Sequence, residues 1–150
     1  STKTLCPLAL ADTGLRWHLR AYDREKDRFA DFALTRIVKA KALDSPIPVE
    51  EQIESDVQWA RIVHIELVPH PGIAHPKAIE ADFRMNNGVL ALDMRAPLVG
   101  YALRRWSVDC SNDHGLDPKE HHLWLSNPQT LYGVESADLA PGFKRTKGQA

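Results

Sequence analysis

Cysteine and long apolar runs are both scarce in this 150-residue chain. Its two cysteines, Cys6 and Cys110, lie far apart in the sequence, which excludes a disulfide framework. No stretch approaches the roughly 18–20 consecutive apolar residues of a membrane span, and no basic-then-apolar signal segment opens the chain. Eight Gly and ten Pro are too few for a low-complexity disordered chain. We therefore expect a globular protein with no membrane contact and a cytoplasmic location.

Excess charge of one sign is also lacking, since the net charge is only −1, but the charges are unevenly distributed. Residues 1–41 hold nine Lys/Arg against five Asp/Glu, whereas residues 42–95 hold four against nine. Residues 96–150 are balanced at six of each. A basic N-terminal segment followed by an acidic segment predicts two units. The basic N-terminal unit is the one expected to bind an anion.

The front of the chain has the two-residue period of β-strands. Leu15–Tyr22 alternates apolar and polar residues, and a charged turn separates it from a second apolar segment, Phe29–Leu34. This pattern predicts a hairpin. Further short strands are predicted over Leu8–Ala11 and Ile37–Ala42. Consecutive short strands with tight turns favour a small barrel.

The pattern changes after a proline-containing acidic stretch, which we interpret as a linker over residues 44–58. Beyond it, strands and proline-initiated helices are predicted to alternate. The predicted strands cover Ala60–Val68, Val89–Met94 and His121–Leu125. Helices are expected from Pro76, from Pro97 to about Trp106, and from Asn127 to about Ser136, with a polar loop over residues 107–120.

A cluster of cationic and aromatic side chains on the predicted hairpin is the strongest candidate site. Guanidinium groups bind phosphate through two hydrogen bonds, and aromatic rings stack on bases, so the cluster suits a nucleotide or a nucleic-acid fragment. A solvated strand face is the alternative from spacing alone. The candidate ligand-binding residues are Arg16, His18, Arg20, Tyr22, Phe32 and Arg36, and the apolar alternation assigns Trp17, Leu19 and Leu34 to the core.

Two histidine groups raise the alternative of a metal- or His-dependent hydrolase. His70 and His75 flank a Pro-Gly turn near Glu80 and Asp82, but no nucleophile or phosphate-loop signature accompanies them. A second group, Cys110, His114, His121 and His122, lies within thirteen residues but matches no closed zinc pattern. We assign no catalytic residue, no metal and no cofactor, and keep the hydrolase and a purely structural dimerisation module as alternatives.

The hairpin residues resemble the WYL domain of bacterial transcription regulators. The similarity rests on Pro7-Leu8-Ala9-Leu10, on Gly14 through Tyr22, and on Phe32–Ile37. Trp17-His18-Leu19 takes the place of the naming triplet, with His18 where the family has Tyr, and Leu8 stands where it usually has His. The Arg-Trp-His-x-Arg-Ala-Tyr form resembles the repressors of BREX and CBASS phage-defence islands. Those repressors are similar downstream too, over Ala78–Val89 and Leu98–Trp106.

The resemblance implies the ligand-sensing and dimerisation half of a regulator. It implies an α+β fold, in which a partial Sm/SH3-like WYL barrel (1–43) and the linker (44–58) precede a ferredoxin-like C-terminal dimerisation domain (59–140) and a flexible tail (141–150). Arg20, Tyr22 and Arg36 would line the ligand pocket. Operator DNA would be contacted only by a winged helix-turn-helix outside this chain. The expected partners are an anionic effector and a second copy, with Tyr101 and Arg105 at the interface.

Overall fold

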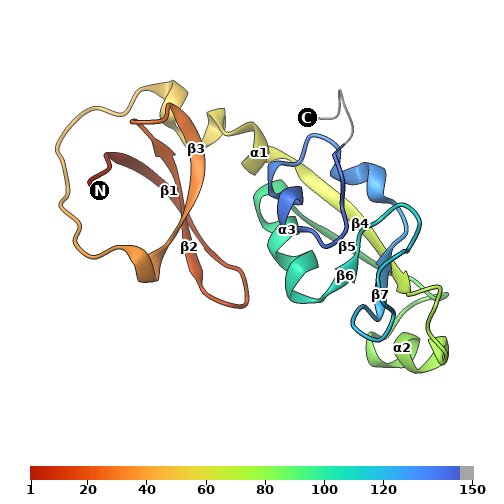
Figure 1. Cartoon of the computed structure of the whole chain (residues 1–150). Coiled ribbons are helices and arrows are strands. Elements are labelled where there is room, and N and C mark those ends of the chain that lie inside the picture. The colour runs from red at the N-terminus through yellow and green to blue at the C-terminus, as the bar shows by residue number, and fades with distance from the viewer. Residues whose placement is uncertain (146–150) are drawn as a thin grey trace. The chain divides into compact units, whose positions relative to one another are not determined.

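The computed structural model describes residues 1–145, which fall into two compact units. The first unit spans Ser1–Ala60, and the second begins at Arg61. Each unit has its own β-sheet together with short helices (Figure 1), so the predicted α+β class is confirmed. Within the described part of the chain, no helix is long and apolar enough to cross a membrane.

The first unit is an antiparallel sheet of three strands. Strands β1 (Leu5–Asp12), β2 (Trp17–Asp23) and β3 (Arg28–Ala33) pair in the order β1-β2-β3. Residues 24–27 form the charged turn, where Asp27 adopts a positive φ of 54°, a conformation that Asp tolerates better than most residues. The predicted hairpin and the preceding strand are therefore confirmed.

The partial Sm/SH3-like barrel is not confirmed, because the three strands form an open sheet (Figure 1). The strand predicted over Ile37–Ala42 is wrong: residues 37–48 contain neither helix nor strand, and all of them are exposed. Period-two alternation produces a strand only when a neighbouring strand supplies hydrogen-bond partners, and this segment has no such pairing.

The predicted burial of β2 needs correction, because its polar face is covered and part of its apolar face is not. The side chains of His18 and Arg20 are only 6% and 4% exposed. Trp17 is 51% exposed and Leu15, just before the strand, 75% exposed. Alternation sorts side chains into two faces but does not say which face another segment will cover.

The segment covering the polar face comes from the predicted linker. It contains two short 3₁₀ helices, η2 (Val49–Glu51) and η3 (Ile53–Ser55), followed by the helix α1 (Val57–Ala60). Asp56, between η3 and α1, is 1% exposed. This segment is part of the first unit, so residues 49–60 are packed structure rather than a free tether.

The second unit has a mixed sheet in the order β5-β4-β7-β6. Strand β4 (Ile62–Pro69) pairs antiparallel with β5 (Leu90–Arg95) and with β7 (Leu123–Leu125), and β6 (Val108–Asp109) pairs parallel with β7. The three predicted strands are present. The two-residue β6, within the predicted polar loop, was not predicted.

Proline lies in the first turn of two helices of this unit, close to where the sequence predicts each helix to begin. Helix α2 (Pro76–Asp82) starts at its proline, and α3 (Ala96–Arg105) has Pro97 in its first turn. The helix predicted from Asn127 is instead two 3₁₀ helices, η4 (Pro128–Leu131) and η5 (Glu135–Leu139). Gly133 lies between them with a φ of +76°, and such a left-handed residue interrupts an α-helix.

The ferredoxin-like arrangement is not confirmed. A ferredoxin-like unit runs β-α-β-β-α-β, whereas this unit runs β4-α2-β5-α3-β6-β7. The predicted tail is ordered in its first part, because Phe143 packs against the core and Arg145 Nε donates to Asp138 Oδ1 at 2.6 Å. Residues 146–150 lie outside the described residues.

The core of the second unit lies on one face of its sheet. Alternate residues of β4 point into it, while Ile62 and His64 on the opposite face are exposed. This one-sided burial is typical of an antiparallel pair with one solvated face. The cluster consists mainly of Val63, Ile65, Leu67, Leu123 and Leu125 from the sheet, Val99 and Leu103 from α3, and Leu131, Val134 and Ala137 from the C-terminal segment.

Helix α3 and η5 approach so closely that only glycine fits at the contact. A Cβ on Gly100 would lie 1.8 Å from the backbone oxygen of Ser136. The Ser136 hydroxyl accepts from Gly100 N at 3.0 Å and donates to Ala96 O at 2.5 Å. The hydroxyl thus contacts both Gly100 N and Ala96 O, which are the donor and acceptor of one i to i−4 pair of the helix.

We predict that Gly100→Ala destabilises the second unit, although Ala is the better helix former by about 1 kcal/mol. The new methyl group overlaps the Ser136 carbonyl, so α3 and η5 must separate. The expected loss is several kcal/mol, measured by urea unfolding. Ala102→Gly in the same helix measures the ordinary propensity cost. A Gly100→Ala protein at least as stable as the parent would contradict the close contact.

Candidate functional site

A buried arginine is the centre of the candidate site on the first unit. Arg20 Nε and Nη2 donate to the two carboxylate oxygens of Asp56 at 2.7 and 2.9 Å. Arg20 Nη1 donates to Asp31 Oδ1 at 3.2 Å. Asp56 therefore grips the guanidinium with two nearly parallel hydrogen bonds, the geometry in which Arg also binds phosphate.

Two local structures place the carboxylates around Arg20. Asp31 lies directly across from Arg20 in the β2–β3 register, so strand pairing alone fixes its position. Asp56 precedes α1, and its Oδ1 also accepts a hydrogen bond from Trp59 N at 3.2 Å. Asp56 is thus both the N-cap of α1 and a counterion of Arg20.

The electrostatics at this centre follow from burial and pairing. Burial lowers the pKa of Arg20, but the hydrogen bonds and charges of Asp56 and Asp31 outweigh it and hold the pKa above its ordinary value. For Asp31, burial raises the pKa, because it disfavours the charged carboxylate. The positive charge of Arg20 offsets only part of that increase. Arg20 is a permanent cation on this face.

Two other predicted ligand residues lie on the Arg20 face. His18 and Tyr22 flank Arg20 at two-residue spacing on β2. The Tyr22 hydroxyl donates to Asp27, which raises the pKa of Tyr22 to about 12. Its ring meets Phe29 edge-on, with centroids 5.0 Å apart. The structure thus brings His18, Arg20 and Tyr22 together.

The remaining predicted ligand residues lie elsewhere. Phe32 pairs with Leu19 on the opposite face of the sheet, and Lys3 Nζ lies 5.9 Å from its ring centroid. Arg36 is exposed in the 3₁₀ helix η1 (Leu34–Arg36). Arg16 precedes β2 and is half-buried, and its Nε makes no hydrogen bond to a described residue.

The residues predicted to form the core of this unit are less buried than expected. Trp17, at 51% exposure, is not a core residue of the described unit, which corrects that prediction. Leu19 and Leu34 are half-buried. The buried side chains of this sheet include Cys6 and Ala21 and two polar residues, His18 and Arg20.

The sequence prediction missed the acidic half of the site. Asp56 lies 36 residues from Arg20, inside the segment interpreted as a linker. Its only sequence signal is an Asp placed directly before Val-Gln-Trp, a possible N-cap. The sequence signal for Asp31 is weaker: it is the single acidic residue within the apolar Phe29–Leu34 segment.

The His70 group is a structural network rather than a catalytic one. His70 Nδ1 accepts from Gly72 N at 3.0 Å, so Nε2 carries the proton that it donates to Asp109 Oδ2 at 2.9 Å. Burial raises the pKa of Asp109, but hydrogen bonds from Ser111, His70 and Leu116 outweigh it and hold that pKa below its ordinary value. Because both ring nitrogens are engaged, His70 has none left to activate a nucleophile.

The other histidines and Cys110 do not assemble into a metal site. His121 Nδ1 lies 2.8 Å from Ser107 O, and the His114 ring packs edge-on against Trp124 and His70. Cys110 is 1% exposed, and this burial raises the pKa of its thiol. Within residues 1–145, no group of three or more His, Cys, Asp or Glu side chains could hold a metal ion.

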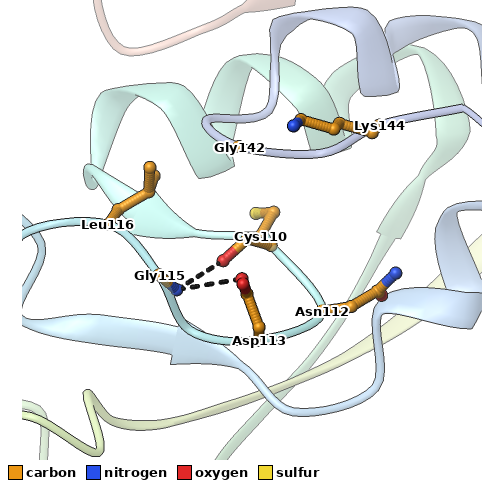
Figure 2. A pocket seen from close by; sticks show the side chains of 8 residues that line it. Cys110, Asn112, Asp113, Gly115, Leu116, Gly142 and Lys144 are labelled. Atoms are coloured by element: carbon orange, nitrogen blue, oxygen red, sulfur yellow. Dashed lines mark hydrogen bonds between the residues drawn. The ribbon is translucent and has the colours of Figure 1, made fainter.

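A cavity of about 470 Å³ lies beside the loop formed by residues 110–116 (Figure 2). Its polar groups largely bond one another: Gly115 N donates to Ser111 Oγ at 2.9 Å and to Asp113 Oδ1 at 3.2 Å. Two polar groups of the lining, Ser111 Oγ and Asp113 Oδ1, are therefore already engaged by the Gly115 amide. Its lining residues are Cys110, Ser111, Asn112, Asp113, Gly115, Leu116, Gly142 and Lys144.

The residues predicted at a dimer interface lie on α3. Tyr101 is half-buried, and Arg105 is exposed in the last turn. Trp106, which caps the helix, is also exposed. Val99 and Leu103 of the same helix face the core, so α3 has one covered side and one accessible aromatic and cationic end.

Two family models match the chain, and each match lies within one structural unit. Residues 1–42 match the WYL domain, and residues 62–131 match the BrxR transcriptional regulator C-terminal dimerization domain. Together the two matches cover most of the chain. The first unit is thus similar to a WYL domain, and the second unit is similar to the dimerisation domain of a transcriptional regulator.

Several DNA-binding transcriptional repressors named CapW are similar to this chain. The one from Escherichia coli strain KTE188 is 33% identical over 136 residues, which cover 89% of this chain and 44% of the repressor. The Pseudomonas aeruginosa protein is 38% identical over 103 residues, 67% of this chain and 33% of the repressor. The Stenotrophomonas maltophilia protein is 31% identical over 129 residues, 85% of this chain and 42% of the repressor. The chain thus spans less than half the length of these relatives.

We predict that Asp56→Ala lowers the unfolding free energy of the first unit by about 3–5 kcal/mol, because it leaves the buried Arg20 with a single carboxylate. Hydrogen exchange of the β2 amides measures the change. Glu51→Ala is the matched control: it breaks the partly exposed Arg24–Glu51 pair of the same segment and should cost about 1 kcal/mol or less. An equal loss of unfolding free energy in both variants would show that the buried Arg20–Asp56 pair stabilises the first unit no more than the partly exposed Arg24–Glu51 pair does.

Proposed function

We propose that this chain is the ligand-sensing and dimerisation part of a bacterial transcriptional repressor. The first unit would bind an anionic effector, either a nucleotide or a single-stranded nucleic-acid fragment. Binding would control how a winged helix-turn-helix segment of the longer protein holds operator DNA. The sheet of the first unit would be part of an Sm/SH3-like barrel, and the protein would work in the cytoplasm.

The single observation that carries the ligand proposal is the Arg20 fork on the WYL-matching unit. A buried guanidinium already holds one planar oxyanion through two hydrogen bonds, at 2.7 and 2.9 Å. Phosphate presents oxygen pairs of the same spacing to arginine. His18 and Tyr22 on the same face add a ring and a further polar group for a nucleoside.

The matches to known proteins support the regulator class. The relatives that cover most of this chain are named as DNA-binding transcriptional repressors, and the second unit matches a dimerisation domain. A repressor responds to an effector only if the effector binds one of its states better than the other. The metal-dependent hydrolase alternative has no group of side chains that could hold a metal ion among residues 1–145, so the regulator is the function we propose.

We predict that Arg20→Ala weakens binding of a short single-stranded oligonucleotide at least tenfold at low salt, because it removes the buried phosphate partner. Fluorescence anisotropy of a labelled hexathymidylate measures the affinity. Arg28→Ala is the matched control, since exposed Arg28 lies on the opposite face of the same sheet.

Arg36→Ala should have a smaller effect than Arg20→Ala, because Arg36 is exposed in η1. Arg61 would be a poor control: its guanidinium donates to Tyr132 O and Thr130 O, so its loss also disturbs the second unit. If Arg28→Ala weakens binding as much as Arg20→Ala does, then the oligonucleotide binds through the general surface charge of the protein and not at the Arg20 site.

We also propose a homodimer that uses the accessible end of α3. Tyr101→Ala combined with Arg105→Glu should shift the protein toward monomer, because it removes an aromatic contact and reverses a charge. Sedimentation equilibrium measures the mass, and circular dichroism checks that the helix content is unchanged. Lys77→Glu on exposed α2 is the control for charge. An unchanged mass in the double variant would exclude this surface as the interface.

A further inference from the structure

Asp56 occupies the position at Arg20 that a bidentate anionic ligand would take. Both of its carboxylate oxygens bind the guanidinium, and the pair is almost completely enclosed, with Arg20 4% and Asp56 1% exposed. A phosphate group cannot form the same two hydrogen bonds while Asp56 remains there. Any ligand that uses this fork must therefore compete with a residue of the chain itself.

We propose that Asp56 is an internal competitor for the effector, and that an anionic effector binds Arg20 by displacing this carboxylate and so uncapping α1. This inference rests on the proposed function of the Arg20 site. It assigns to the segment 49–60 the role of a latch that is closed when the effector is absent.

Of the two carboxylates at Arg20, Asp56 is the one that can leave. Asp31 belongs to β3 and is held across from Arg20 by the ladder of the β2–β3 pair. Asp56 belongs to a segment of short helices outside the sheet. That segment also meets the hairpin at Arg24, which contacts Glu51 at 2.8 Å on the partly exposed side. A partly exposed pair such as Arg24–Glu51 contributes little stability, so it adds little that would hold the segment in place once Asp56 is displaced.

Departure of Asp56 has a direct structural consequence in α1. The helix is four residues long, and its Trp59 N–H is capped by Asp56 Oδ1. Such a short helix has little stability of its own and depends on its cap. Ala60, the last residue of α1, is also the last residue of the first unit. Effector binding at Arg20 would thus loosen the residues through which the chain enters the dimerisation unit.

The test compares Asp56→Asn with the parent for binding of 5′-phosphorylated dithymidine, with the unphosphorylated dinucleotide as the neutral ligand. Asn keeps the side-chain shape and a capping oxygen, and Asp31 remains as the counterion of Arg20. We expect the variant to bind the phosphorylated probe roughly five- to hundredfold more tightly, the usual range of such coupling. Glu51→Gln is the matched control, because it removes the same charge from the same segment without touching Arg20.

Hydrogen exchange of the parent protein gives a second measurement that needs no variant. Saturating probe should lower the protection of the Trp59 and Ala60 amides, which bond to Asp56 Oδ1 and Asp56 O, and leave the β2 amides protected. A parent that binds the probe, with Asp56→Asn no tighter than Glu51→Gln or with α1 exchange unchanged, would overturn the latch and leave the proposed ligand site standing. Absence of binding in the parent and in both variants would overturn the proposed function together with the latch.

Discussion

The first unit depends on the need to keep the buried charge of Arg20 paired. A guanidinium removed from water loses several kcal/mol of solvation, and only well-placed carboxylates and hydrogen bonds compensate for it. One carboxylate comes from the neighbouring strand, but the other must come from a distant segment. Pairing with Asp56 draws residues 49–60 onto the polar face of the sheet, and this contact gives the apparent linker its structure.

The second unit is held together by a different kind of interaction. Its core is a continuous apolar cluster between one face of the sheet, α3 and the 3₁₀ segments, and Gly100 allows the backbones of α3 and η5 to touch. Buried apolar area contributes roughly 25 cal/mol per Å² and offers no charged group to which an anion could bind. The second unit also holds a buried carboxylate, Asp109, which is bonded to His70. Its cohesion nevertheless comes mainly from the apolar cluster, whereas the first unit depends on the ion pairs of Arg20.

This contrast gives the proposed repressor a physical route from effector to dimer. An anion competes directly with the charged contacts of the first unit but has no means of disrupting the apolar core of the second. The effect of the ligand would therefore be confined to the Arg20 site and to α1. Since α1 ends at the boundary between the units, a local change of counterion would be passed on without unfolding either unit.

Local sequence signals were sufficient to locate most of the strands and helices and to indicate the family. Alternation located the three strands of the first unit, proline located the starts of α2 and α3, and the residues around Trp17-His18-Leu19 indicated the WYL family that the comparisons bear out. These signals are local, because they depend on residues close together in the chain. They also placed Arg20 on one face of a hairpin.

Contacts between distant segments set which face of that hairpin is buried and which carboxylate neutralises Arg20. Alternation is symmetric between the two faces, so it could not show that His18 and Arg20 lie inside while Trp17 is half exposed. The partner Asp56 is 36 residues away and carries no pattern that pairs it with an arginine. The missing strand over Ile37–Ala42 has the same origin, because no other segment among residues 1–145 pairs with it. Pairing and packing depend on segments far apart in sequence, and only folding brings those segments together.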